Sequence, residues 1–93
     1  MAPVVVEFDP EKRCLVLENR GLDMARADEV LAGKTITVED DRQDYGEASF
    51  ISFGFLDNRL VVIAWTMRGP AFRIITMRKA NEREDKKYRH RLD

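Results

Sequence analysis

The chain has 93 residues, of which 44% are hydrophobic and 35% charged, and its formal net charge is −1. This length fits a single domain over residues 1–93, and the composition is typical of a folded globular protein and excludes a disordered chain. No apolar stretch reaches the ~20 residues of a membrane span. The single cysteine, Cys14, has no partner for an internal disulfide, which favours the reducing cytoplasm.

The charge is unevenly distributed along the chain. Residues 68–93 contain nine Lys or Arg and four Asp or Glu, whereas residues 1–67 contain seven and thirteen. A basic second half is what a polyanion-binding surface needs. A charged helix that only keeps the protein in solution would give the same balance, so composition alone leaves both interpretations open.

The chain is expected to begin with a strand and a helix. Val4–Phe8 is a short apolar run without a preceding basic segment, so we interpret it as a strand and not as a signal peptide. Asp9 is a suitable N-cap, Pro10 suits the first helical position, and Gly21 is a typical left-handed C-cap. The expected apolar side of this helix consists of Cys14, Leu15 and Leu17.

A second helix is expected from the N-cap Asp23 to Gly33, because apolar residues recur there at helical spacing. The β-branched run Thr35–Val38 then predicts a strand, and the polar segment Glu39–Gly46 predicts a loop.

Three strands and a final helix are expected to complete the chain. The strands are Glu47–Leu56, Arg59–Arg68 and Ala71–Arg78, separated by the turn formers Asp57-Asn58 and Gly69-Pro70. A charged helix starts near Asn81, with Glu84 completing a capping box. The resulting order, β-α-α-β-β-β-β-α, predicts an α+β fold with a mostly antiparallel sheet.

Symmetric closure of the two hairpins predicts one polar group of side chains on the sheet. Glu47 then faces Arg68, Ser49 faces Thr66, and Thr66 faces Arg73, all on the same side of the sheet. Further along, that face becomes apolar, and Trp65 lies on the opposite face beneath the helices. The residues expected on the apolar part are Ile51, Phe53, Phe55, Leu60, Val62, Ala64, Ile75 and Met77.

The polar group has two explanations. Arginine is a planar, permanently charged donor suited to phosphate oxygens, and a nearby carboxylate can act as a base or hold an arginine in place. Taken alone, however, the pattern favours a simple cross-strand ion pair between Glu47 and Arg68, worth about 0.2–1 kcal/mol. A one-residue bulge in either hairpin would break the alignment.

Other chemistry finds little support in the sequence. His90 is the one histidine and Cys14 has no Cys-x-x-Cys partner, so no metal site is expected. The acidic segment Glu39–Glu47 lacks the alternating ligand spacing of a calcium loop. There is no glycine-rich phosphate loop or dinucleotide fingerprint, so no cofactor is expected.

Several short motifs occur in an order that resembles the BrnT family of toxins from type II toxin–antitoxin systems. They cover nearly the whole chain: Phe8-Asp9-Pro10-Glu11-Lys12, a glycine between two short helices (Gly21), Gly46-Glu47, Thr66-Met67-Arg68, Arg73-Ile74-Ile75-Thr76-Met77-Arg78-Lys79-Ala80, and a charged helix from Glu82 to Tyr88.

This resemblance implies a fold similar to RelE-type ribonucleases and metal-independent cleavage of RNA by a cytoplasmic endoribonuclease. It further implies a BrnA-like antitoxin with a ribbon-helix-helix DNA-binding domain, assembled with the toxin as a two-plus-two complex. The motif residues Glu47, Thr66, Arg68 and Arg73 coincide with the predicted polar group, which moves our interpretation from an ion pair to a catalytic phosphate site. Lys12 and Arg78 are expected as outer contacts to the RNA.

The chain departs from the family pattern at three positions. Ser49 stands where an arginine is usual, Asn19-Arg20-Gly21 replaces Lys-His-Gly, and Trp65 replaces a histidine or tyrosine. Two alternatives therefore stay open: a weak or inactive toxin-fold module that pairs with an antitoxin in operon regulation, and a nucleic-acid-binding domain without cleavage.

Overall fold

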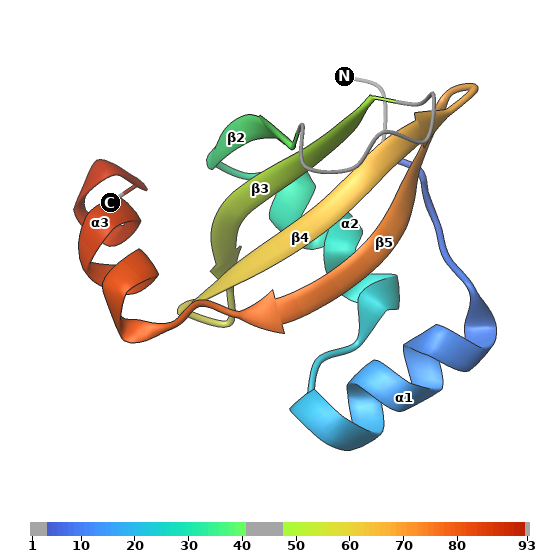
Figure 1. The fold of residues 1–93 in the computed structure, drawn as a ribbon, viewed down its shortest axis with the longest axis horizontal. Coiled ribbons are helices and arrows are strands. Elements are labelled where there is room, and N and C mark those ends of the chain that lie inside the picture. The colour runs from blue at the N-terminus through green and yellow to red at the C-terminus, as the bar shows by residue number, and fades with distance from the viewer. Residues whose placement is uncertain (1–3, 41–47, 93) are drawn as a thin grey trace.

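The computed structural model describes residues 4–40 and 48–92. Its elements are β1 (Val6–Glu7), α1 (Pro10–Arg20), the 3₁₀ turn η1 (Met24–Arg26), α2 (Ala27–Leu31), β2 (Thr35–Asp40), β3 (Ser49–Leu56), β4 (Arg59–Arg68), β5 (Ala71–Lys79) and α3 (Glu82–Leu92). One five-stranded sheet has the order β1-β5-β4-β3-β2, with β1 parallel to β5 and the other pairs antiparallel (Figure 1). The α+β class and the mostly antiparallel sheet are confirmed.

Helix α1 begins and ends as the sequence predicts, but it buries a different side. The carboxylate of Asp9 accepts a hydrogen bond from the Glu11 N–H at 2.9 Å, and Gly21 closes the helix with φ 68°. The buried residue of α1 is Val16, whereas the expected apolar side is exposed. The helix packs against β5, near the edge of the sheet. One residue of α1 therefore reaches the core, although the sequence predicts an apolar side of several residues. The residues wrongly assigned to the core are Cys14, Leu15 and Leu17.

The second expected helix is divided into η1 and α2. Asp23 caps η1 through the Ala25 N–H, and the short α2 follows directly. A Cβ atom added at Gly54 of β3 would lie 2.7 Å from Cγ1 of Val30, which shows how closely α2 approaches the sheet. Strand β2 extends to Asp40, two residues beyond the predicted end, and residues 41–46 of the expected loop lie outside the described part.

The two hairpins follow the predicted register at the end of the sheet that contains Thr66. Ser49 lies opposite Thr66, and Thr66 lies opposite Arg73. The β4–β5 pairing then shifts by one residue between Ala64 and Trp65, so that Thr76 faces Ala64 and Met77 faces Ile63. This bulge reverses the faces of the following β5 residues. Met77 therefore lies on the opposite face from the one predicted, fully buried.

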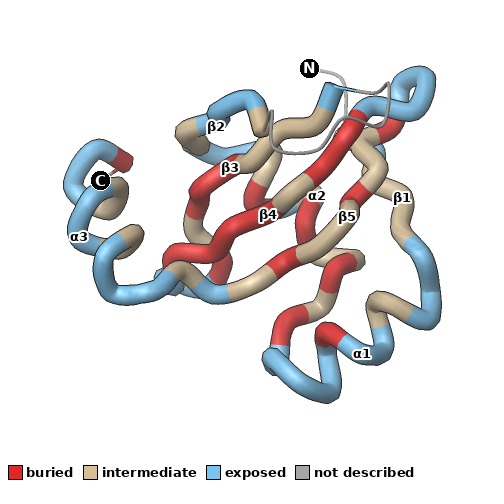
Figure 2. Tube along the Cα trace, in the orientation of Figure 1, coloured by how far each residue is buried: buried red, intermediate tan, exposed pale blue. Residues whose placement is uncertain are grey.

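The sheet separates two hydrophobic clusters (Figure 2). The larger lies beneath α1, η1 and α2 and contains Trp65, as predicted, together with Met24, Val30, Ile63 and Met77. The smaller lies on the other face, where α3 packs over the end of the sheet near the β3–β4 turn; it comprises Phe53, Leu60, Val62 and Leu92, with Ile36, Ile51, Phe55, Ala80 and Tyr88 at its margin. No described helix has the length and apolar character to cross a membrane.

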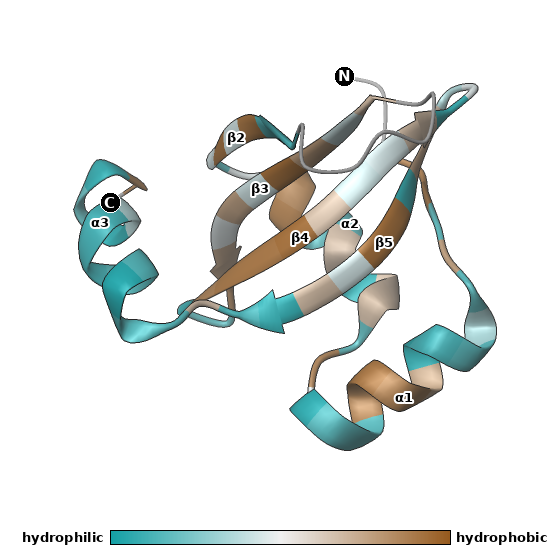
Figure 3. Cartoon of the chain, in the orientation of Figure 1, coloured by the Kyte–Doolittle hydropathy of each residue, from teal (hydrophilic) through white to brown (hydrophobic). Residues whose placement is uncertain are grey.

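Helix α3 is hydrophilic along nearly its whole length and is held by a few specific contacts (Figure 3). Asn81 and Glu84 form the predicted capping box, with N–H to oxygen distances of 2.8 and 2.9 Å. The ring of Tyr88 stacks on Phe53 with centroids 4.0 Å apart. These contacts place α3 at one end of the face that carries the predicted polar group.

Candidate functional site

A row of polar residues crosses all five strands at the end of the sheet away from α3. The register pairs Glu7 of β1 with Arg73, Arg73 with Thr66, Thr66 with Ser49, and Ser49 with Asp40 of β2. Directly paired residues point to the same side of a sheet, so these five side chains share one face. We call these five residues the polar row. They lie on the face that carries the smaller hydrophobic cluster, beyond its margin.

Arg73 is the cation at the centre of the polar row. Its side chain is 32% exposed, and its Nη1 lies 3.8 Å from Oε1 of Glu7, which is 42% exposed. This distance makes a loose ion pair, so the guanidinium keeps hydrogen-bond donors for another acidic group. The carboxylate of this pair, Glu7, belongs to β1, and the sequence does not predict that β1 lies beside β5.

Thr66 is buried, and its hydroxyl is engaged. Oγ1 donates to the carbonyl oxygen of Ala48 at 2.6 Å. A hydroxyl has one hydrogen, so this group has no donor left for a phosphate oxygen. Ser49 beside it donates to the Asp40 carbonyl at 3.1 Å. Both hydroxyls therefore fix the backbone at the start of β3.

Arg68 ends β4 two residues beyond Thr66 on the same face. Its side chain is exposed and forms no hydrogen bond or ion pair with another residue in the described part of the chain. Sheet geometry puts its backbone position about 7–8 Å from that of Arg73, diagonally across the hairpin, so both guanidiniums can reach one phosphate. Glu47, the predicted partner of Arg68, lies outside the described residues.

The two expected outer contacts have different surroundings. Lys12 lies on α1 beside the open edge of β5; it is half-buried, and its ammonium has no partner among the described residues. Arg78 forms a two-pronged ion pair with Glu84, with nitrogen–oxygen distances of 2.7 and 2.8 Å. The Arg78 guanidinium lowers the pKa of the Glu84 carboxyl below its ordinary value. This arrangement joins β5 to α3 and draws Arg78 away from the polar row.

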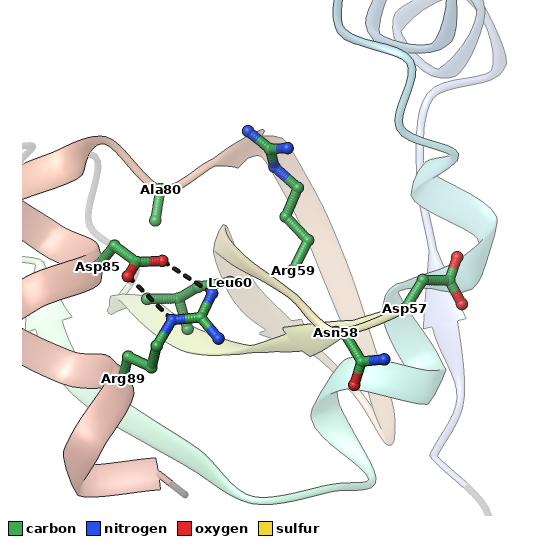
Figure 4. Close-up of a pocket in the computed structure, with 7 residues that line it drawn as sticks. All are labelled: Asp57, Asn58, Arg59, Leu60, Ala80, Asp85 and Arg89. Atoms are coloured by element: carbon green, nitrogen blue, oxygen red, sulfur yellow. Dashed lines mark hydrogen bonds and ion pairs between the residues drawn. The ribbon is translucent and has the colours of Figure 1, made fainter.

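A cavity lies at the other end of the sheet. It has a volume of about 470 Å³ and is lined by the β3–β4 turn and α3. Figure 4 shows Asp85 and Arg89 paired within it, at 2.9 Å. Two carboxylates and two guanidiniums line this cavity, so it offers no net positive charge to an anion. The polar row is the better place for phosphate chemistry.

The polar row and Arg68 can bind a phosphate and move a proton. Two guanidiniums can share the charge that develops on a pentavalent phosphorus, and a carboxylate lies beside one of them. No cluster of three or more potential metal-ligating side chains occurs among residues 4–40 and 48–92.

Comparison with protein families identifies one match. No curated protein sequence matches the chain. The family model described as "Ribonuclease toxin, BrnT, of type II toxin-antitoxin system" matches residues 8–84, a span that contains Lys12, Thr66, Arg68 and Arg73. The chain belongs to the BrnT family of ribonuclease toxins.

Proposed function

We propose that this protein is a metal-independent endoribonuclease whose reaction takes place over the polar row. Family membership implies RNA as the target and an antitoxin as the partner. The observation that carries the proposal is the convergence of Arg68 and Arg73 on one face, next to carboxylates and within the segment that the family model covers. A fold similar to RelE-type ribonucleases and a cytoplasmic location belong to the same proposal.

The reaction proceeds by attack of a ribose 2′-hydroxyl on the adjacent phosphorus. Arg68 and Arg73 hold the two non-bridging oxygens and stabilise their growing negative charge. A carboxylate accepts the proton of the 2′-hydroxyl, and the departing 5′-oxygen takes a proton from a water molecule bound to an arginine. The products are a 2′,3′-cyclic phosphate and a 5′-hydroxyl end.

Two carboxylates are candidates for the proton acceptor. Glu47 is the motif residue, and Glu7 is the one that lies beside Arg73. Thr66 was expected to donate a hydrogen bond to RNA, but its hydrogen is given to Ala48. We therefore assign Thr66 a positioning role: it fixes Ala48, the neighbour of Glu47 in the chain. Lys12 is proposed as an outer contact to the RNA backbone, and Arg78 as a weaker one, because its guanidinium is paired with Glu84.

The partner is proposed to be a BrnA-like antitoxin with a ribbon-helix-helix domain, in a two-plus-two complex. Toxin–antitoxin pairing of this kind would block the polar row. Co-purification of the toxin with the product of the neighbouring gene, followed by mass measurement of the intact complex, tests partner and stoichiometry together.

Cleavage of a labelled single-stranded RNA in the presence of EDTA tests the activity. The wild-type protein should cut the RNA and leave a cyclic phosphate end, while Arg68→Ala and Arg73→Ala should each lose at least ~100-fold in rate, the size of effect seen when one charge-stabilising donor is removed. Lys34→Ala, at an exposed position near the β2 edge, is the matched control. Full activity in both arginine variants would remove the polar row from the mechanism.

A second candidate function rests on Ser49. The family pattern usually places an arginine there, and here the serine hydroxyl is bonded to the Asp40 carbonyl instead. A toxin-fold module that binds RNA or an antitoxin without cutting would fit a site with one cation fewer. RNA that is bound but recovered intact, with binding lost in the Arg68→Ala and Arg73→Ala variants, would favour this candidate.

A further inference from the structure

A small pocket lies between α1 and the edge of β5. Its volume is about 220 Å³, and its lining is Lys12, Leu15, Val16, Asn19 and Arg20 from α1, with Thr76 from β5. The α1 residues recur at helical spacing and so share one side of the helix. Val16 is buried against the sheet, whereas Leu15 is 56% exposed and forms an open apolar wall.

The bulge in β5 aligns this pocket with the polar row. Arg73 faces Thr66 and Thr76 faces Ala64, two residues further along β4 on the same face. At the rise of an antiparallel strand, two residues correspond to about 7 Å. Without the bulge, Thr76 would lie on the buried face. The pocket thus begins roughly one nucleotide of a stretched RNA strand away from Arg73.

The edge of β5 holds Arg20 in position. Beyond Arg73, the register assigns β5 no partner on the side of β1, so its outer edge is open in the described part of the chain. Nη1 of Arg20 donates to the Met77 carbonyl at 3.0 Å and to Oγ1 of Thr76 at 3.2 Å. Nε and Nη2 of Arg20 form no hydrogen bond with a described residue, so their hydrogens stay available.

The pocket presents an excess of hydrogen-bond donors. Thr76 accepts from Arg20, so its own hydroxyl hydrogen is free to donate. The Lys12 ammonium and the Asn19 amide form no hydrogen bond with a described residue, and the lining contains no carboxylate. The pocket at the β3–β4 turn differs in this respect, because it includes Asp57 and Asp85. The pocket lining thus combines two cations, Lys12 and Arg20, with unused hydrogen-bond donors and no carboxylate. This combination suits a phosphate group.

We propose that this pocket is a second phosphate subsite, which binds the RNA phosphate next to the one that is cleaved. The inference rests on the proposed function for its ligand, RNA, and adds the path of the strand: from Arg68 and Arg73, along the open edge of β5, to Lys12 and Arg20. Leu15 then contacts the ribose or base of the nucleotide between the two phosphates.

Binding of an uncleavable RNA tests the subsite apart from catalysis. The ligand is a 2′-fluoro tetranucleotide with three phosphates, which lacks the attacking hydroxyl, and its affinity is measured over a range of salt concentrations. Loss of one phosphate contact to a single strand lowers the magnitude of the log–log salt slope by about 0.7. Lys12→Ala should show this decrease, and Lys34→Ala should keep the wild-type slope.

Ligand length provides the second measurement. The wild type should prefer the tetranucleotide over a 2′-fluoro dinucleotide, which has a single phosphate, and this preference should shrink at least about threefold in Lys12→Ala and in Thr76→Val. Both variants spare the Arg20 bond to the Met77 carbonyl, and thermal melting confirms that they are folded.

The outcomes separate the two proposals. Unchanged slope and unchanged length preference in folded Lys12→Ala and Thr76→Val would overturn the subsite while RNA binding by the wild type stands. Absence of RNA binding by the wild type would overturn the subsite and the proposed function together. Binding with the predicted changes but without cleavage of natural RNA would support the subsite and contradict only the enzymatic activity.

Discussion

Thr66 illustrates how one side chain can belong to a site without touching its ligand. Sequence reasoning placed it correctly on the face of Arg73, and the register confirms that placement. Its burial and its 2.6 Å bond to the Ala48 carbonyl give it another task, because they hold the chain where β3 begins. We propose that the hydroxyl acts through the backbone on Glu47, the residue before Ala48 in the chain.

Replacement of Thr66 by valine tests this positioning role. Thr66→Val keeps the shape but removes the hydrogen bond, so the free energy of unfolding in urea should fall by about 1 kcal/mol. RNA affinity should stay unchanged while the cleavage rate falls, because the phosphate contacts remain but Glu47 is less well placed. Thr66→Ser keeps the hydrogen bond, so its free energy of unfolding and its cleavage rate should be close to those of the wild type. A valine variant with weakened RNA affinity and wild-type stability would instead assign Thr66 a direct contact.

The sequence identified the centre of the candidate site but not its ends. Ser49, Thr66 and Arg73 follow from strand alternation and two recognisable turns. Glu7 could not be assigned, because a two-residue parallel strand pairs with a distant segment and leaves no local pattern. Asp40 was placed in a loop because its charge resembled that of the acidic segment that follows.

At the scale of elements, the bulge in β5 accounts for the largest error in the predicted faces. Alternation predicts the sides of a strand only while the register is constant, and no glycine or proline marks the shift near Ile75. The same irregularity brings Thr76 to the side of Arg73. The apolar side of α1 was wrong for a related reason: only tertiary packing determines which side of a short helix meets the sheet.

The junction of β5 with α3 gives a prediction at this scale. Arg78 and Glu84 form a two-pronged pair, and Glu84 also caps α3. Alanine at either position should lower the free energy of unfolding, with the larger loss for Glu84→Ala because it also removes the capping bond. A double-mutant cycle in urea should give a coupling energy of about 0.5–1 kcal/mol.

The same variants decide whether Arg78 also contacts RNA. If its guanidinium is committed to Glu84, Arg78→Ala should weaken RNA binding much less than Arg73→Ala. Equal losses of RNA affinity in the two variants, with no coupling to Glu84, would make Arg78 part of the RNA surface and not an anchor for α3.

At the scale of the whole molecule, the two faces of the sheet differ: one provides most of the hydrophobic packing, and the other carries the candidate site. The face beneath α1, η1 and α2 contains the larger hydrophobic cluster and supplies most of the packing. The opposite face is apolar near α3 and becomes polar toward Arg68 and Arg73. We therefore expect substitutions of Arg73 and of exposed Arg68 to change RNA cleavage at small cost in stability. The ion pairs that connect α1 with η1 and β5 with α3 depend on carboxylates.

Those carboxylates predict how the stability changes with pH. The hydrogen bond from Arg13, with the Ala25 N–H, lowers the pKa of Asp23 to about 2 from an ordinary 3.8. Arg78 lowers the pKa of Glu84, and Arg89 lowers that of Asp85. Because each carboxyl binds its proton more readily when unfolded, the stabilisation is present above about pH 4 and is lost as the pH falls toward 2.

Urea unfolding between neutral pH and pH 2 measures this loss. Asp23→Asn retains an oxygen to cap η1 but cannot titrate, so it should be less stable at neutral pH and show a shallower decline in acid. Glu18→Gln is the matched control, since the Glu18 carboxylate is exposed and has no ion-pair partner in the described part of the chain; its profile should follow the wild type. An equal acid decline in Asp23→Asn and wild type would mean that the Arg13–Asp23 pair contributes nothing to folding, and that α1 is held to η1 by Val16 and its apolar neighbours alone.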